Sequence, residues 1–236
     1  MHATCSLGLM LFDVSRPATR IAPGVAHVPG WVDVAKQRAL VEETREVARR
    51  YAGTPMAMYQ PQLKSGKMSV HQLHLGRYWH YETYRYVDNI EGTRVPPMLV
   101  SLQEIARPAL RAAAEVSPEL EPWVETFYPE MALVNYYPPG SGMGMHVDDF
   151  EESLAPVISL SIGDEALFRI GNTENRNKPW DDVTLSSGDL IVFGGPKRLA
   201  YHGIVRVNDA TLPEGCGLKE GRINITIRQV GARATL

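Results

Sequence analysis

The chain has 236 residues, 44% of them hydrophobic and 22% charged, which is the composition of a globular protein able to bury a single core. Its formal net charge of −3 excludes a protein that coats nucleic acid through bulk positive charge, so contact with nucleic acid would need a local basic patch. Its two cysteines, Cys5 and Cys216, lack the spacing of a zinc site or a disulfide framework and indicate a reducing, cytoplasmic setting.

The opening segment carries no targeting or membrane signal. Residues 1–16 contain a short apolar run, but no positive charge precedes it and no convincing small-residue cleavage site follows it. We therefore expect these residues to belong to the mature chain. Nowhere do about 18 apolar residues follow one another, so no membrane partner is expected.

Two helices are predicted in the N-terminal half. Apolar residues recur at helical spacing over 32–51, and Asp33 is placed to cap the start of this helix. A second helix is predicted over 101–116, where Ser101 and Glu104 have the spacing of a capping box.

From Trp123 to the C-terminus, short strands are predicted to alternate with turns. Residues 156–163 alternate isoleucine and leucine with serine, which is typical of a half-buried strand. Further strands are expected at 131–137, 166–171, 182–186, 189–193, 200–207 and 222–230. Many short strands in succession favour a mainly β, α+β fold with a sandwich or jelly roll over a parallel sheet.

Three residues have the chemistry and spacing of a metal site. His146 and Asp148 occupy alternate positions, so on an extended backbone both side chains leave the same face. His202 follows Asp148 by 54 residues (202 − 148 = 54), with four predicted strands between, a separation that a two-sheet barrel can close. Two histidines and one carboxylate leave coordination positions open, as in non-haem iron oxygenases, whereas a structural zinc site has four protein ligands. Alone, such a spacing is more often found among unrelated surface residues.

The last predicted strand carries two arginines on one face. Residues 222–228 alternate polar and apolar side chains, so the isoleucines are expected in a core and Arg222 and Arg228 on the opposite face. On an ordinary sheet that face would be solvated, but inside a barrel its polar groups need partners. The two guanidinium groups, roughly 20 Å apart along the strand, could bend inward to bind a dicarboxylate. Asn135 and Tyr137, two residues apart on another strand, supply matching hydrogen-bonding groups.

Several blocks of sequence also recur together in one known family. They are Asn135-Tyr136-Tyr137-Pro138-Pro139-Gly140, His146-Val147-Asp148, 156–163, Ser187-Gly188-Asp189, Phe193-Gly194-Gly195, Tyr201-His202-Gly203-Ile204 and 222–228. In order and spacing they resemble the AlkB family of Fe(II)- and 2-oxoglutarate-dependent dioxygenases over about 131–230. The resemblance implies a double-stranded β-helix, a jelly roll, with Fe(II) bound by His146, Asp148 and His202. It also implies that 2-oxoglutarate is held at its metal-side carboxylate by Asn135 and Arg228 and at its distal carboxylate by Tyr137, Arg222 and Asn224.

The resemblance further implies an oxidative demethylase of N-alkylated bases in DNA or RNA, of the DNA-repair type. Such an enzyme uses O2 and 2-oxoglutarate, hydroxylates the N-methyl group, and releases formaldehyde, succinate and CO2. We expect a monomer with one domain, 1–236, in which 1–122 supplies helices and a lid at about 54–89, and 123–236 forms the jelly-roll core. Two alternatives stay open: the same iron chemistry on a small molecule or a free nucleoside or nucleotide, and a metal-binding jelly roll without catalysis. The predicted diacid site speaks against the second.

Substrate choice is expected to lie in the lid. Trp79, Tyr84 and Tyr86 could stack on a flipped base of alkylated single-stranded DNA or RNA, although they could equally be packing aromatics beneath a long loop.

The position two residues after the metal-site aspartate departs from the family pattern. Repair-type members commonly have an acidic residue there that is associated with the damaged base, whereas this chain has Phe150, flanked by Asp149 and Glu151. Either a neighbouring carboxylate has taken over the role, or the pocket prefers a more apolar substrate.

Overall fold

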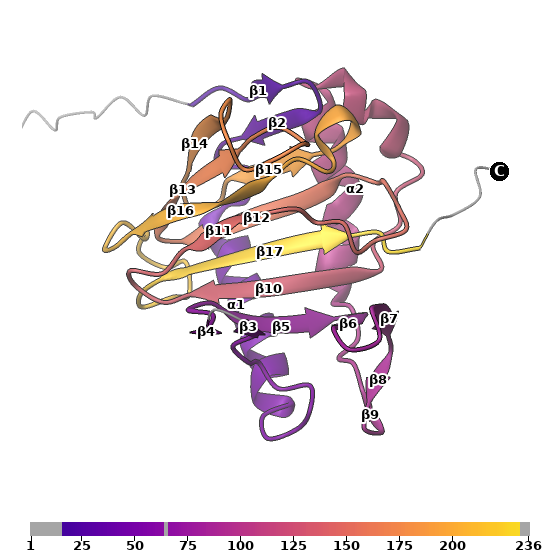
Figure 1. The fold of residues 1–236 in the computed structure, drawn as a ribbon. Coiled ribbons are helices and arrows are strands. Elements are labelled where there is room, and N and C mark those ends of the chain that lie inside the picture. The colour runs from indigo at the N-terminus through magenta and orange to yellow at the C-terminus, as the bar shows by residue number, and fades with distance from the viewer. Residues whose placement is uncertain (1–15, 64–65, 232–236) are drawn as a thin grey trace, which may run out of the picture.

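Two facing antiparallel sheets form the centre of the molecule. The computed structural model describes residues 16–63 and 66–231, so most of the opening segment discussed above lies outside the described residues. The larger sheet has seven strands in the order β1-β2-β15-β12-β17-β10-β5, and the smaller has four in the order β11-β16-β13-β14 (Figure 1). This arrangement is the expected jelly roll.

The strands of both sheets have the following bounds. The large sheet contains β1 (Thr19–Ala22), β2 (Val25–Val28), β5 (His71–Leu75), β10 (Met131–Tyr137), β12 (Val157–Gly163), β15 (Leu190–Phe193) and β17 (Arg222–Arg228). The small sheet contains β11 (Met143–His146), β13 (Glu165–Ile170), β14 (Asp181–Leu185) and β16 (His202–Asn208). The seven predicted strands are all present. Four short strands, β11, β1, β2 and β5, were not expected as members of the sheets.

Two helices cover the large sheet on the face away from the small one. Helix α1 (Val34–Arg50) begins where predicted, and the Asp33 carboxylate accepts a hydrogen bond from the Lys36 amide at 2.7 Å. Helix α2 (Val100–Ala114) begins one residue before the expected start, and the predicted capping box is wrong. Leu99 is its N-cap without a side-chain bond, because Ser101 lies inside the first turn and donates to Glu43. A short 3-10 helix, η1 (Pro118–Trp123), follows.

Strand β12 is buried on both faces, which corrects the expected half-buried strand. Ile158, Leu160 and Ile162 pack in the core beneath the helices. Ser159 and Ser161 point to the space between the sheets, where they are also buried. The serines are shielded because the second sheet lies over them, and a single-strand pattern does not reveal a second layer.

The segment 54–89, expected as a lid, contains several short paired strands. Strand β5 pairs with β10 and so extends the large sheet by one strand. Beyond it, β6 (Tyr78–His80) and β7 (Arg85–Val87) form a hairpin at the end of β5 (Figure 1). Two short strand pairs and one 3-10 turn are the remaining elements of the described residues. They are β3 (Gln62–Leu63) with β4 (Gly66–Lys67), β8 (Asn89–Ile90) with β9 (Thr93–Arg94), and η2 (Gly195–Lys197). Within the described residues, no helix is both long and apolar enough to cross a membrane.

Candidate active site

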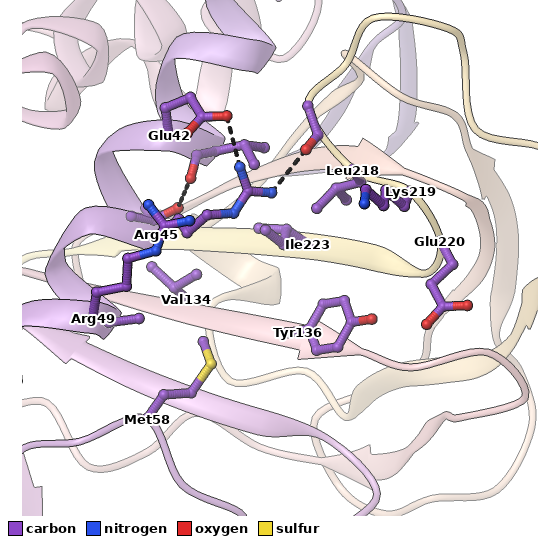
Figure 2. Close-up of a pocket in the computed structure, with 14 residues that line it drawn as sticks. Glu42, Arg45, Arg49, Met58, Val134, Tyr136, Leu218, Lys219, Glu220 and Ile223 are labelled. Carbon is purple, nitrogen blue, oxygen red and sulfur yellow. Dashed lines mark hydrogen bonds and ion pairs between the residues drawn. The ribbon is translucent and has the colours of Figure 1, made fainter. Parts of the chain in front are cut away.

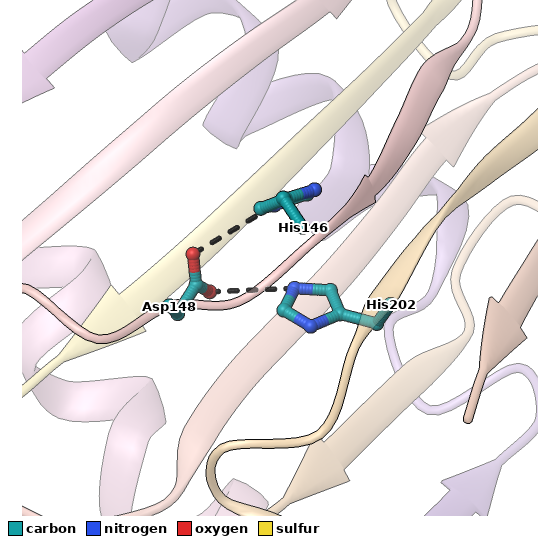
Figure 3. A group of neighbouring side chains, drawn as sticks. All are labelled: His146, Asp148 and His202. Carbon is teal, nitrogen blue, oxygen red and sulfur yellow. Dashed lines mark ion pairs between the residues drawn. The ribbon is translucent and has the colours of Figure 1, made fainter. Parts of the chain in front are cut away.

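The small sheet brings the three predicted metal ligands together. Strands β11 and β16 pair so that His146 lies opposite His202, and Asp148 follows in the loop after β11. One ligand atom from each residue lies within 4.8 Å of the others. The Asp148 carboxylate faces both imidazoles, at 3.7 Å from His146 Nε2 and 3.4 Å from His202 Nε2 (Figure 3).

The hydrogen bonds of the two histidines determine which nitrogen faces the centre. His146 Nδ1 lies 2.9 Å from the Gly144 carbonyl, and His202 Nδ1 lies 3.0 Å from the Ala200 carbonyl. Because a carbonyl only accepts, each neutral ring donates from Nδ1 and presents the lone pair of Nε2 to Asp148. Two lone pairs and a carboxylate then face one another, an arrangement that a divalent cation would stabilise.

Protonation of the cluster also suits a metal. Burial, together with the neighbouring His202, lowers the pKa of His146 to about 4, so its imidazole is neutral near pH 7. Burial alone would raise the pKa of Asp148, but Arg228 and the two histidines outweigh it and hold that pKa well below its usual value. The donor set is therefore the imidazoles of His146 and His202 and the carboxylate of Asp148, which fits Fe(II).

A cavity of about 600 Å³ opens in front of this cluster, between the two sheets. The polar face of β17 lines it, as the alternation of 222–228 predicted, while Ile223, Ile225 and Ile227 pack in the core behind. All five predicted cosubstrate contacts line this cavity: Asn135, Tyr137, Arg222, Asn224 and Arg228.

The two arginines of β17 differ in their partners. Arg228 pairs with Asp148 at 2.7 Å and with Glu151 at 2.9 Å. Arg222 is 1% exposed, donates to Ser161 at 2.9 Å, lies 5.1 Å from the Tyr137 ring, and has no carboxylate partner among the described residues. A buried guanidinium without an anion is costly, so Arg222 is the group that most needs an acidic ligand.

Unsatisfied polar atoms are concentrated in this cavity. Within the described part of the chain, nine buried side-chain nitrogen or oxygen atoms lack a hydrogen-bond partner, and eight belong to residues that line the cavity. They come from Gln72, His74, Trp79, Arg222, Thr226, Arg228 and Asp148. The atom of Asp148 is Oδ2, which has no hydrogen bond but forms the ion pair with Arg228. Since buried polar groups normally have partners, this clustering indicates a ligand-binding site.

A second cavity, of about 690 Å³, lies between α1 and the outer face of the large sheet (Figure 2). Arg45 already donates to Glu42 and to the Gly217 carbonyl there. None of the nine unsatisfied atoms belongs to its lining. Because the unsatisfied polar atoms lie in the cavity between the sheets and not in the second cavity, the first is favoured as the functional site.

The six predicted substrate contacts divide into two groups. Trp79, Tyr86 and Phe150 line the cavity. The other three are not among its lining residues: Tyr84 and Asp149 are exposed, and the Glu151 side chain is fully buried in ion pairs. The sequence analysis did not identify Gln72, His74 and Arg176 as lining residues. Gln72 and His74 are two residues apart, so an extended strand places both side chains on one face, and this spacing is the signal that could have identified them.

Comparisons with known proteins find relatives that align over most of the chain. The 2OG-Fe(II) oxygenase superfamily matches residues 24–228. The chain is 35% identical to an alpha-ketoglutarate-dependent dioxygenase AlkB homolog of Caulobacter vibrioides (strain NA1000 / CB15N), over 97% of this chain and 96% of that protein. It is 29% identical to the DNA N(6)-methyladenine demethylase ALKBH1C of Arabidopsis thaliana, over 89% of this chain and 49% of that protein. The solved structure of OsALKBH1 superposes with a TM-score of 0.76 and 26% identity, over 90% of this chain and all of that one.

Proposed function

Because the chain belongs to the AlkB family within the 2OG-Fe(II) oxygenase superfamily, we propose that it removes N-alkyl groups from the bases of DNA or RNA by oxidation. It is an Fe(II)- and 2-oxoglutarate-dependent dioxygenase, and O2 and 2-oxoglutarate are its cosubstrates. The observation that carries the proposal is a single cavity that holds a His-Asp-His cluster, a buried unpaired arginine and an aromatic wall. The names of its relatives support a nucleic-acid substrate.

The chain's own residues prepare the site for this chemistry. His146 and His202 would hold the metal through Nε2, and Asp148 supplies the anionic ligand. Arg222, Asn224 and Tyr137 are proposed to hold the distal carboxylate of 2-oxoglutarate, and Asn135 and Arg228 the metal-side carboxylate. When bound, Fe(II) would supply the activation of O2, by which one oxygen atom would enter an N-methyl C–H bond and the other would enter succinate as 2-oxoglutarate loses CO2. The hydroxymethyl product would then release formaldehyde.

The protein also positions the base and shields the metal cluster from solvent. The cavity lies between two sheets and beside the β6–β7 hairpin, so a base must leave its stack to reach the cluster. This requirement supports single-stranded DNA or RNA as the partner, with 54–89 as the lid. We also propose a monomer, since one chain supplies every group of the site, and a cytoplasmic role in DNA repair.

Turnover of methylated oligonucleotides tests this function. The protein is incubated with Fe(II), 2-oxoglutarate and single-stranded oligonucleotides that carry one N-methylated base, and products are followed by mass and by formaldehyde release. We expect demethylation by the native chain, none by His146→Ala, and retained activity in His80→Ala, whose histidine lies outside the cavity lining. Turnover of free methylated nucleosides without turnover of any oligonucleotide would replace the proposal by the small-molecule alternative.

A further inference from the structure

Two aromatic rings form a parallel stack in the wall of the cavity. Trp79 and Phe150 have ring centroids 4.3 Å apart and an interplanar angle of 18°. Tyr81 meets Phe150 edge-on, at 6.4 Å and 84°. Trp79 is 7% exposed and Phe150 38%, so the stack runs from the buried part of the cavity toward its mouth. Because the two rings cover one face of each other, a nucleobase would stack on the outer face of the pair, and such stacking binds any planar ring without regard to sequence.

The charges around the cavity are mainly positive. Three arginines line it, Arg176, Arg222 and Arg228, against one carboxylate, that of Asp148. Asp148 belongs to the metal cluster and is paired with Arg228 at 2.7 Å. Fe(II) and the 2-oxoglutarate dianion carry equal and opposite charges, so their joint binding does not change this balance.

The neighbouring carboxylate of Glu151 is not available to a base. Its side chain is fully buried, and Arg198 binds Oε2 at 2.9 Å. Oε1 accepts from Arg228 at 2.9 Å and from the Tyr86 hydroxyl at 2.6 Å. Asp149, on the other side of Phe150, is exposed and does not line the cavity.

The remaining titratable groups near the stack are uncharged. Burial, with a smaller effect of Arg228, lowers the pKa of His74 to about 3, and its imidazole is neutral near pH 7. Burial raises the pKa of Tyr86 and of Tyr81, whose phenols stay protonated. Among the described residues of the cavity, no free negative charge remains to balance a cationic base.

We infer that this cavity selects uncharged N-methylated bases over cationic ones, and that Phe150 is a specificity-determining residue. The inference rests on the proposed function. N6-methyladenine and N3-methylthymine are neutral, whereas N1-methyladenine and N3-methylcytosine are cations near pH 7. A cation in this cavity would lose its hydration and meet no unpaired carboxylate, whereas a neutral ring needs only the stacking faces.

Matched oligonucleotides isolate the charge of the base. N6-methyladenine and N1-methyladenine present the same base and the same number of methyl groups, in one single-stranded sequence, and N3-methylthymine and N3-methylcytosine form a second pair. Dissociation constants are measured by fluorescence anisotropy with Mn(II) and N-oxalylglycine, and kcat/KM by formaldehyde release with Fe(II) and 2-oxoglutarate. We expect the neutral member of each pair to be preferred by roughly tenfold in both measurements.

A variant at position 150 tests the role of the side chain. Phe150→Asp places a carboxylate beside Trp79 and should shift the ratio toward the cationic member by roughly tenfold or more. Phe150→Leu removes the aromatic ring without adding charge, so it should weaken binding of both members and keep the preference for the neutral one. Circular dichroism and thermal unfolding confirm that both variants fold.

The outcomes separate the two proposals. Preference for the cationic bases by the native chain, or an unchanged ratio in Phe150→Asp, overturns the charge selection while demethylation stands. Absence of demethylation of all four oligonucleotides, with turnover of free nucleosides, overturns the proposed function instead. In that case the ratio of dissociation constants for the matched nucleosides still decides the charge selection.

Discussion

Arg222 and Arg228 leave the same face of β17 but differ in their surroundings. Arg228 has two carboxylate partners, whereas Arg222 has none among the described residues and burial lowers its pKa. The alternation of the sequence makes the two side chains equivalent, and only their neighbours distinguish them. Arg222 is thus a buried cation without an anion, whereas Arg228 already binds the carboxylates of Asp148 and Glu151.

Replacing Arg222 by leucine tests this difference. Without cosubstrate, Arg222→Leu should unfold at a temperature no lower than the native chain, because a buried unpaired charge has been removed. The KM for 2-oxoglutarate should rise at least about tenfold, since charge-assisted hydrogen bonds contribute roughly 1.5–3 kcal/mol. Initial rates of succinate formation and thermal unfolding measure the two effects. Arg169→Leu, which breaks an ion pair with Asp182 outside the cavity, is the matched control. An unchanged KM for 2-oxoglutarate in Arg222→Leu would show that Arg222 does not bind the cosubstrate.

At the scale of elements, the β6–β7 hairpin is tied to the loop that follows the metal-site aspartate. The Tyr86 hydroxyl of β7 donates to Glu151, and Glu151 in turn binds Arg198 and Arg228. One carboxylate therefore joins the hairpin to β17 and to the segment before β16. The stacking of Trp79 on Phe150 is a second contact between the hairpin and the loop that follows Asp148.

Tyr86→Phe should loosen the hairpin without disturbing the metal cluster. Loss of one hydrogen bond costs about 1 kcal/mol, which corresponds to roughly fivefold weaker oligonucleotide binding. Deuterium exchange at the amides of 78–87 should become faster, while the stabilisation of the protein by Mn(II) stays unchanged. Tyr128→Phe, a change in a half-exposed tyrosine outside the hairpin and the cavity lining, should affect neither measurement. Unaltered exchange in Tyr86→Phe would show that the hairpin is held by stacking alone.

At the scale of the whole molecule, Asp189 joins the N-terminal strands to the jelly roll. Its buried carboxylate pairs with Arg16 at 2.7 Å and with His27 at 2.8 Å, and it accepts from the Gly30 and Ser186 amides. Burial alone would raise its pKa, but these bonds outweigh burial and lower it. A depressed pKa in the folded state stabilises the fold above the unfolded pKa of about 3.9, and this contribution is lost as the pH falls further.

Asp189→Asn should therefore destabilise the protein in a pH-dependent way. Near pH 7 the free energy of unfolding should fall by about 2 kcal/mol, because the amide cannot replace a charged acceptor of four donors. The difference from the native chain should shrink below about pH 4, as the native carboxylate takes up its proton. Urea unfolding at pH 7 and at lower pH measures the difference. Asp181→Asn, a change in an exposed aspartate, is the control. A difference that does not change with pH would mean that the charge of Asp189 contributes nothing to stability.

Short-range sequence patterns account for the features that could be predicted from the sequence alone. The alternation of 222–228 determined which side chains share a face, and the boundaries of β10 and the cap at Asp33 follow from neighbours a few residues away. The spacing of His146 and Asp148, with the family blocks, identified the metal cluster. These features depend on short segments, whose geometry the backbone imposes wherever the segment lies.

Contacts between distant segments were decided by the tertiary structure alone. Strand β5 became an edge strand because β10 offered it a partner, and β12 became fully buried because a second sheet covers its serines. The stacking of Phe150 on Trp79, and the engagement of Glu151 by Arg198, join residues 71 and 47 positions apart (150 − 79 = 71; 198 − 151 = 47). Charge balance in a cavity is a sum over every segment that lines it, so no single stretch of sequence contains it.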